Sequence, residues 1–535
     1  MRKFLTLLLL PLALAALLCA CTVTTPPQET PPCTHTDADG DLHCDLCREE
    51  LPKPDCTTHA DANGNAQCDV CDKRLPATPC ETHTNTNSDF FCDTCGRFVD
   101  ETVTGWLLEG VPAYKGGTPS TALYLAGQGI DSEQPTKKEN VMQTVSSTTA
   151  AHFAAYLAKL NMAGYEQEFY RTVDENLFAS YLKGNVRVYT YFMSRTGEAR
   201  IVKELTENST ALSAFEYTYE KKAGEQSELY QFALAMNDET HAKPNFKDNG
   251  MLYIIKLADN SVVIIDGANS NQIADERRDE LMYLLWEITG SNVGDTVRIA
   301  GWYITHSHGD HYGGFVKFTW KYAKYLQLER VFFALPSVNS PHEVFNTGSG
   351  ADGYLAVAKL IKEYYADDNT QFLRLHTGQS FMLADVYFDV LQTHEDLTDP
   401  ASAQTKITNY NDASAIIRID IDGATFLFLG DAGEKVAMPK ILKNWSAEHL
   451  RTDGIQLAHH VMNDLSDLYE VVRAEVLFAP QAQYGIDISD KRVAIFAAAK
   501  AFAREDMVFL QNEATVGIAV VKGQWEVSYF KPFVY

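Results

Sequence analysis

The chain has 535 residues, of which 45% are hydrophobic and 11% aromatic, so it is a globular protein too long for one ordinary core. Its 45 basic and 71 acidic residues give a net charge of −26, which repels phosphate backbones and disfavours nucleic acid as the default partner. All 11 cysteines lie at or before Cys95, so the rest of the chain uses no thiol chemistry.

The first residues read "MRKFLTLLLLPLALAALLCAC". A basic start precedes an apolar stretch that is short for a membrane span, and small residues precede Cys21, as in a bacterial lipoprotein signal. The pattern predicts a signal peptide over 1–21 and lipid modification of Cys21, which anchors the protein outside the cytoplasm on the cell membrane. A plain secretory signal with another cleavage site is the alternative, and both predict export.

Residues 22–100 are expected to form a linker and three repeats with a period of about 24 residues. The repeats read "CTHTDADGDLHCDLC", "CTTHADANGNAQCDVC" and "CETHTNTNSDFFCDTC". Each repeat holds three cysteines, an odd number that disulfides within the repeat cannot satisfy. Together with one histidine they make four ligands, the number that a closed tetrahedral zinc site needs. The predicted ligand sets are Cys33, His35, Cys44 and Cys47; Cys56, His59, Cys68 and Cys71; and Cys80, His83, Cys92 and Cys95.

Acidic and amide residues alternate between these ligands, as in the first half of an EF-hand loop. The glycine at the sixth and the glutamate at the twelfth position of such a loop are absent. Structural zinc, calcium, and disulfide-linked or metal-free repeats therefore all remain open. Units this small need a metal or a cross-link, and their expected role is a stalk or adhesive spacer.

Residues 101–225 are predicted to form a small α/β domain of unknown role. Apolar spacing over 148–168 predicts a helix, and alternation over 186–194 and 198–205 predicts a pair of strands. No cluster of catalytic residue types occurs in this part of the sequence.

Residues 226–535 alternate short strands and helices, which predicts a layered α/β domain. Two strands joined by a turn are expected in 250–268, and an amphipathic helix in 275–289. A strand over 297–305 leads into a histidine-rich loop, and a helix over 314–326 leaves it. Further strands are predicted within 379–392, 414–431 and 454–460.

The histidine-rich loop reads "ITHSHGDHYGG" and places His306, His308, Asp310 and His311 within a few positions of a strand end. Imidazole and carboxylate groups are the usual ligands of a borderline cation such as zinc, so the loop predicts a metal site. Three further motifs supply acids and histidines: "IIDGA" with Asp266, "FLFLGD" ending at Asp431, and "LAHH" with His459 and His460.

In this order the four motifs resemble the metallo-β-lactamase fold superfamily, an αββα sandwich with its metal site at one edge, over residues 226–535. Within it they are most similar to the competence-protein-like subgroup associated with DNA uptake. The resemblance implies that one ion is bound by His306 and His308 and a second by Asp310 and His311. Asp431 then bridges the ions, His459 completes the second site, Asp266 orients a ligand, and His460 has no settled role.

Two features depart from the superfamily pattern. The histidine that often completes the first site is missing from "ITNYNDAS", where Asn411 or Asp412 fills or vacates the position and His394 is a less favoured substitute. The subgroup's later glycine-histidine-proline element is also absent. The third ligand of the first ion is therefore open. One or two zinc ions suit the ligands best, with manganese or iron as alternatives.

These residues predict a metal-dependent hydrolase that acts on phosphodiester or related ester bonds in a small molecule or polymer. Paired ions make water acidic enough to attack near neutral pH. Asp310 and His311 are the candidate catalytic residues, and Asp310 can accept or pass a proton. The alternatives are hydrolysis of a lactam, lactone or thioester, and a surface adhesion protein that binds without turnover. The sequence leaves the oligomeric state open.

Overall fold

The chain divides into two compact units, Met1–Val99 and Asp100–Tyr535, in the computed structural model. The structure describes residues 68, 70, 82–84, 86, 91–95, 98–100, 102–120, 123–126, 136–206, 212–234, 250–273, 275–335, 357, 359–360, 363–365, 369–397, 410–512, 514–521 and 523–530. The predicted signal peptide, Cys21 and most of the predicted repeat ligands lie outside these residues. Among the described helices, none is both long enough and apolar enough to cross a membrane.

The second unit begins with a seven-stranded sheet covered by helix α1 (Ala150–Met162). Its strands are β1 (Thr118–Pro119), β2 (Leu123–Ala126), β3 (Thr136–Ser146), β4 (Glu166–Val173), β5 (Asn176–Lys183), β6 (Val186–Met193) and β7 (Glu198–Leu205). The predicted strand pair forms β6 and β7, which are antiparallel. The predicted helix is shorter than expected, because Gly164 (φ +84°) turns the chain into β4.

Two larger sheets follow. The nine-stranded sheet contains β9 (Glu228–Gln231), β10 (Tyr253–Lys256), β11 (Val262–Ile265), β12 (Val297–Ile304), β13 (Leu326–Leu328), β14 (Arg330–Phe333), β15 (Gln371–Arg374), β23 (Thr515–Val521) and β24 (Gln524–Phe530). The eight-stranded sheet contains β8 (Tyr217–Thr218), β16 (Ser380–Ala384), β17 (Val386–Gln392), β18 (Ile416–Ile421), β19 (Ala424–Phe428), β20 (Gly454–Gln456), β21 (Val476–Ala479) and β22 (Val508–Leu510).

These two sheets pack face to face. Tyr253 of β10 lies against Phe428 of β19 and Phe478 of β21, with ring centroids 5.2 and 5.7 Å from its own. These rings lie in a core that draws on both sheets. Such aromatic contacts fill the space between two sheets that pack about 10 Å apart.

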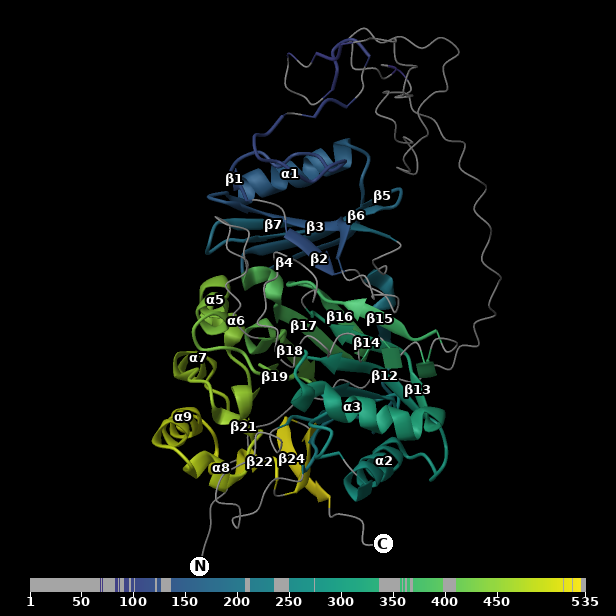
Figure 1. Cartoon of the computed structure of the whole chain (residues 1–535), viewed down its shortest axis with the longest axis vertical. Helices are drawn as coiled ribbons and strands as arrows, with labels where there is room; N and C mark the ends of the chain where they lie inside the picture. Colours follow the sequence, from purple (N-terminus) through teal and green to yellow (C-terminus); the bar gives the residue numbers. More distant parts are fainter. Residues whose placement is uncertain are drawn as a thin grey trace, which may run out of the picture. The chain divides into compact units, whose positions relative to one another are not determined.

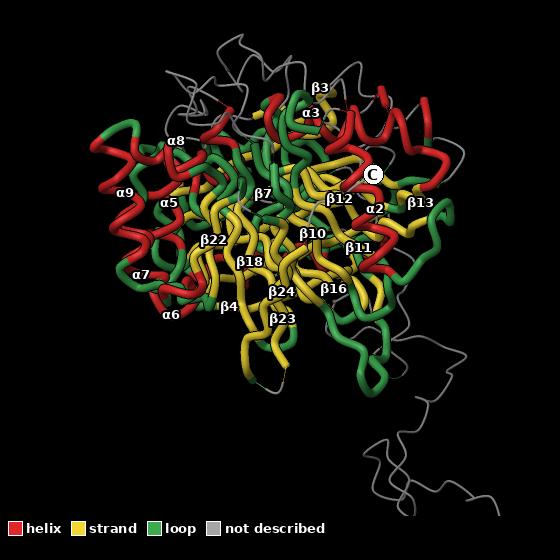
Figure 2. Tube along the Cα trace, turned by 90° about the horizontal axis from the view of Figure 1, so that it is seen from below, coloured by secondary structure: helices red, strands yellow, loops and turns green. Residues whose placement is uncertain are grey.

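Helices cover both outer faces of this pair of sheets. The helices are α2 (Asp275–Thr289), α3 (Gly309–Tyr322), α5 (Ala437–Asn444), α6 (Ala447–Leu450), α7 (Ser466–Val472), α8 (Gln483–Asp487) and α9 (Asp490–Lys500). Helices α2 and α3 pack on the nine-stranded sheet, and α5, α7 and α9 on the eight-stranded sheet. The helices therefore flank the central strands on two sides (Figure 2). This αββα arrangement agrees with the predicted fold class.

The seven-stranded sheet packs against the sandwich, as the blue and green strands of Figure 1 show. Phe178 of β5 stacks on Trp445 with ring centroids 6.0 Å apart. Arg171 of β4 donates two hydrogen bonds to Asp389 of β17, at 2.6 and 2.7 Å. A bidentate pair at a largely buried junction fixes the orientation of the two parts.

Candidate metal centre

The predicted metal ligands gather at the carboxyl ends of neighbouring strands. Strand β12 ends just before His306, and its parallel neighbour β11 ends just before Asp266. In the facing sheet, β19 leads to Asp431, and its parallel neighbour β20 leads to the tandem pair His459 and His460. Because the carboxyl ends of parallel strands meet at one edge, segments distant in sequence are brought together there.

Glycines let helix α3 approach the end of β11 closely. A Cβ on Gly314 would lie 1.7 Å from the carbonyl oxygen of Gly267, so no other residue fits without a shift. Gly314 N donates to Ala268 O at 2.8 Å, and Gly267 N donates to His311 O at 2.5 Å. The first turn of α3, which the sequence analysis assigned to the loop, is thereby held beside Asp266.

Asp266 orients the histidine of this turn. Its Oδ2 lies 2.7 Å from His311 Nδ1, and its Oδ1 accepts from the backbone of Thr305 at 2.9 Å. A carboxylate on one ring nitrogen fixes the tautomer and aims the other nitrogen at a metal. This is the geometry that the orienting role of Asp266 requires.

The tandem histidines have an unusual backbone. His459 (φ 49°, ψ 51°), His460 (φ 51°, ψ 39°) and Val461 (φ 62°) all lie in the left-handed region. Each such residue costs on the order of 1–3 kcal/mol, so the surrounding structure must impose it, as it does at functional sites. The result is that two adjacent side chains reach two different groups of ligands.

The first group consists of His306, His308 and Asp431, whose ligand atoms lie within 4.8 Å of one another. His306 Nε2 is 3.1 Å from His308 Nδ1 and 3.7 Å from Asp431 Oδ2. His459 Nε2 is 3.7 Å from the same Asp431 oxygen. His459 thus lies beside the first group, although it is not one of the three residues whose ligand atoms converge within 4.8 Å.

The second group consists of Asp310, His311, Asp431 and His460, again within 4.8 Å. Asp431 Oδ1 is 3.2 Å from His311 Nε2 and 3.7 Å from His460 Nε2, and His460 Nε2 is 3.3 Å from Asp310 Oδ2. The sequence analysis assigned His459 to this group. The structure places His460 there, because the left-handed turn sends the two rings in different directions.

His306, His459 and His460 are held in a similar way. In each ring, Nδ1 points away from the ligand groups and lies close to an oxygen. His306 Nδ1 lies 3.1 Å from Thr305 Oγ1, and His460 Nδ1 lies 3.3 Å from Pro480 O. His459 Nδ1 lies 2.9 Å from Asn463 Oδ1. The carbonyl of Pro480 accepts only, so the proton is on Nδ1 of His460 and its Nε2 lone pair faces the group.

Asn463 acts on His459 in the same way. Its amide nitrogen donates to the carbonyl oxygens of Asp431 at 3.2 Å and Ala432 at 2.9 Å. The amide oxygen therefore faces His459 Nδ1 as an acceptor, which leaves the lone pair of His459 on Nε2, 3.0 Å from Asn411 Nδ2 and 3.7 Å from Asp431 Oδ2.

A metal fits these donors. His311 Nε2, His460 Nε2 and Asp431 Oδ1 are buried and have no hydrogen-bond partner among the described residues, although they lie 3.2–3.7 Å apart. Buried polar atoms rarely lack a partner, and convergent lone pairs repel unless a cation lies between them. No lysine or arginine pairs with these groups in the described part of the chain.

The electrostatics are those of a cation site. Burial and the neighbouring His311 lower the pKa of His306 well below its usual range, and burial also lowers the pKa of His308. Both rings therefore stay neutral near pH 7 and keep a lone pair for a metal. Burial opposes ionisation of Asp431, but His311, His459 and His460 hold its pKa well below the ordinary value, so it is a carboxylate.

The other predicted ligands are not in either group. Asn411 Nδ2 is 3.0 Å from His459 Nε2, so the amide lies beside the first group. Asp412 packs against Gly433, where an added Cβ would meet its Oδ1 at 1.8 Å. His394 is buried elsewhere, with Nδ1 2.9 Å from Ala334 O. The signal that could have found the third ligand was the tandem histidine itself.

In the first unit, the structure brings three of the predicted repeat ligands together. His83, Cys92 and Cys95 offer ligand atoms within 4.8 Å, and Cys68 of the second repeat is buried. The other predicted repeat ligands lie outside the described residues.

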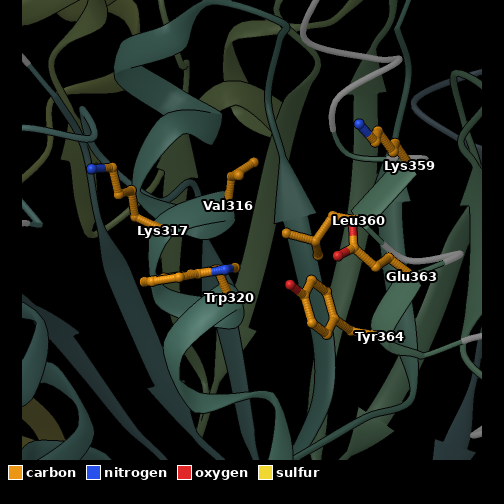
Figure 3. A pocket seen from close by; sticks show the side chains of 7 residues that line it. All are labelled: Val316, Lys317, Trp320, Lys359, Leu360, Glu363 and Tyr364. Atoms are coloured by element: carbon orange, nitrogen blue, oxygen red, sulfur yellow. The ribbon is translucent and has the colours of Figure 1, made fainter.

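A separate cavity of 570 Å³ lies farther along α3 (Figure 3). Val316, Lys317 and Trp320 of α3 face Leu360, Tyr364 and their neighbours across it. It contains none of the metal-binding residues, so we do not regard it as the reaction site.

No family model matches the chain, and no curated protein matches it. Solved structures similar to it include the metallo-beta-lactamase fold protein YhfI from Bacillus subtilis (11% identity, 53% of this chain and 96% of that one, TM-score 0.32). Zn(2+)-bound PqqB from Methylobacterium extorquens (9%, 51% and 96%, 0.32) and the short form of human tRNase Z (13%, 48% and 93%, 0.27) are also similar.

Proposed function

We propose that this chain is a metal-dependent hydrolase of the metallo-β-lactamase fold, which cleaves phosphodiester or related ester bonds. One observation carries the proposal: two groups of metal-binding side chains share Asp431, so two ions would be held side by side. This is the arrangement that in-line displacement at phosphorus uses in two-metal enzymes.

The donor set assigns the residues. His306, His308 and His459 with Asp431 would hold the first ion, and Asp310, His311 and His460 with Asp431 the second. Bound divalent ions supply Lewis acidity that makes water a nucleophile near neutral pH. Nitrogen and carboxylate donors favour zinc, with manganese or iron as alternatives.

The chain's own residues shape the rest of the chemistry. Burial raises the pKa of Asp310, but His460 and His311 lower it below the usual range, so Asp310 is a carboxylate that can receive a proton at its Oδ2. Asp310 and His459 are each 22% exposed, whereas His306, His311, Asp431 and His460 are at most 1% exposed. Substrate therefore approaches over Asp310 and His459.

The net charge of −26 favours a small molecule or a cell-surface polymer over long nucleic acid as the substrate. The export signal and Cys21 support a location outside the cytoplasm, with a lipid anchor on the membrane. We expect the mass of the cell-associated protein to shift in a globomycin-sensitive way. This shift should be lost in Cys21→Ala.

The test is hydrolysis of bis-p-nitrophenyl phosphate by the full chain, after loading with zinc or manganese. Asp310→Ala/His311→Ala removes two ligands of the second group and is expected to abolish turnover. Asp467→Ala, an exposed aspartate in the first turn of α7, is the matched control and should behave as wild type. Equal rates in wild type and the double variant would overturn the proposal.

Hydrolysis of a lactam, lactone or thioester is the second candidate. Those activities rely on a complete first site. His459, whose Nε2 is 3.7 Å from Asp431 Oδ2, would be the residue that completes it. Turnover of nitrocefin or a homoserine lactone with a kcat/KM above that for the phosphodiester would favour this reading.

A further inference from the structure

We propose that the third repeat is a structural zinc site, with His83, Cys92 and Cys95 as ligands. This inference concerns the first unit and does not depend on the hydrolase activity. It selects zinc from the alternatives of zinc, calcium and disulfides that the sequence left open.

The three donors converge although they come from two segments. Cys95 Sγ lies 3.2 Å from His83 Nδ1, and all three ligand atoms lie within 4.8 Å of one another. Ligands about 2.0–2.3 Å from a tetrahedral zinc ion are separated by about 3.3–3.8 Å, so a small inward or outward shift suffices.

Backbone contacts hold the two segments together. Asp93 N donates to Thr84 O at 2.8 Å and joins the two segments. Within the second segment, Phe91 and Phe98 form an antiparallel bridge on either side of the C-x-x-C turn, with their ring centroids 6.2 Å apart. The C-x-x-C turn is thereby fixed beside His83. A short hairpin that carries two cysteines opposite a histidine is a typical zinc-binding arrangement.

Both thiols are placed as ligands rather than as exposed groups. Cys92 and Cys95 are only 1% and 4% exposed. A single repeat of about 24 residues is far too small to bury side chains in a core of its own.

The described contacts disfavour the two alternatives. Calcium requires six or more oxygen ligands, whereas the donors that converge here are two buried sulfurs and an exposed imidazole. Asp93, an acid of the EF-hand-like pattern, accepts at Oδ2 from Thr86 N and Oγ1, both at 2.9 Å, on the exposed side. No disulfide joins Cys92 to Cys95 in the described residues.

The sequence extends the inference to the other repeats. Cys68 precedes Cys92 by about one period and is buried as Cys92 is, which is expected of equivalent positions in a repeat. The repeat pattern also offers Cys80 as a fourth ligand, but the proposal rests on the three described ones.

The experiment uses the full chain, loaded with zinc and passed over a chelating resin. Because no cysteine follows Cys95, p-hydroxymercuribenzoate attacks only the thiols of the N-terminal region, and zinc released by it is measured with 4-(2-pyridylazo)resorcinol. We expect thiol-dependent release of zinc from the wild type, and about one equivalent less from Cys95→Ser. Asp93→Asn, a change at a non-ligand in the same turn, should release as much as wild type.

Cobalt substitution of the wild type tests the proposal without any variant. Two thiolate ligands give an intense sulfur-to-cobalt charge-transfer band in the near ultraviolet, which is expected to disappear with the mercurial. Absence of the band, equal zinc release from wild type and Cys95→Ser, calcium in place of zinc, or thiols found oxidised under non-reducing alkylation would each overturn the proposal.

Discussion

Two buried clusters of ionisable side chains in the second unit neutralise their charge in different ways. The metal centre combines Asp266, Asp310 and Asp431 with five histidines, and no lysine or arginine pairs with them in the described part of the chain. The second cluster, which we name the junction cluster, lies between the seven-stranded sheet and the sandwich. It consists of Arg200, Glu204, Arg374, His376, Glu395 and Asp396.

The junction cluster contains its own cations. Glu395 Oε1 is 2.7 Å from His376 Nδ1 and 3.1 Å from Arg374 Nη2. Arg200 donates to the backbone carbonyls of Glu395 and Asp396 at 3.0 and 3.1 Å. Every member is nearly inaccessible to solvent.

The difference shows how a buried polar cluster can be assigned a role. Charges removed from water are tolerated only when they are paired. The guanidinium groups of Arg200 and Arg374 give the junction cluster cations of its own, and it joins two parts of the fold. The metal centre combines carboxylates and imidazoles without a lysine or arginine among the described residues, which is the donor set that suits metal ions.

The largest expected effect follows from removing the shared carboxylate. Asp431→Ala should lower kcat/KM by roughly 10³-fold or more, because bound ions supply several kcal/mol of transition-state stabilisation. Both equivalents of metal should be lost in elemental analysis. In the presence of a chelator the variant should be as stable as wild type, or more so, since a buried charge has been removed. If Asp431→Ala lost stability but kept its full metal content, the contrast between the metal centre and the junction cluster would be contradicted.

A substitution in the junction cluster should instead lower the stability of the fold. Arg374→Met leaves Glu395 buried without its guanidinium, and breaking such a pair costs about 3–5 kcal/mol in the free energy of unfolding. Denaturant unfolding would measure this loss, and Arg374→Met/Glu395→Gln should recover part of it. Arg504→Met is the control, because that side chain is 46% exposed and its ion pair with Asp506 lies on the surface. A similar loss of unfolding free energy in Arg374→Met and Arg504→Met would refute the distinction between the buried cluster and a surface ion pair.

Stability should also depend on pH through His376. Burial lowers its pKa, but Glu395 and Glu204 raise it to about 9, above the ordinary 6.5. The stabilisation is complete below pH 6.5 and is lost as the pH rises through 9. It corresponds to about 3 kcal/mol at most. Because His376 and Arg374 lower the pKa of Glu395 from 4.5 to about 2 despite its burial, the same pair also weakens as the pH falls below 4.5.

Chelator-treated protein would isolate this effect from metal binding. The free energy of unfolding of wild type should fall between pH 6.5 and 9, and His376→Gln should flatten that slope. An unchanged slope in the variant would assign the pH dependence to other groups.

The sequence predicts the parts of the metal centre that follow from strand ends and motif spacing. His306, His308, Asp310 and His311 are close together because they are neighbours in the chain. Asp431 joins them because its strand runs to the same edge. The separate roles of His459 and His460 could not be predicted, because they depend on consecutive left-handed residues, which are uncommon outside glycine. The junction cluster could not be predicted from the sequence either, because its members come from distant segments of the chain and share no motif.

The smallest effect should come from Asn463, which is in neither group but contacts the His459 ring and the backbone carbonyls of Asp431 and Ala432. Asn463→Ala removes the acceptor at His459 Nδ1, so the ring can rotate or change tautomer, and partners of this kind contribute about 10- to 100-fold in metal affinity. We expect a loss near the lower limit, about 10-fold, confined to one of the two ions in a competition titration. Asn463→Asp keeps an oxygen at that nitrogen and should retain the affinity, whereas Asn292→Ala, in an exposed turn, should have no effect. If Asn463→Ala weakened neither ion, His459 would be a neighbour of the first group rather than its third ligand, and the metal centre would be open on that side.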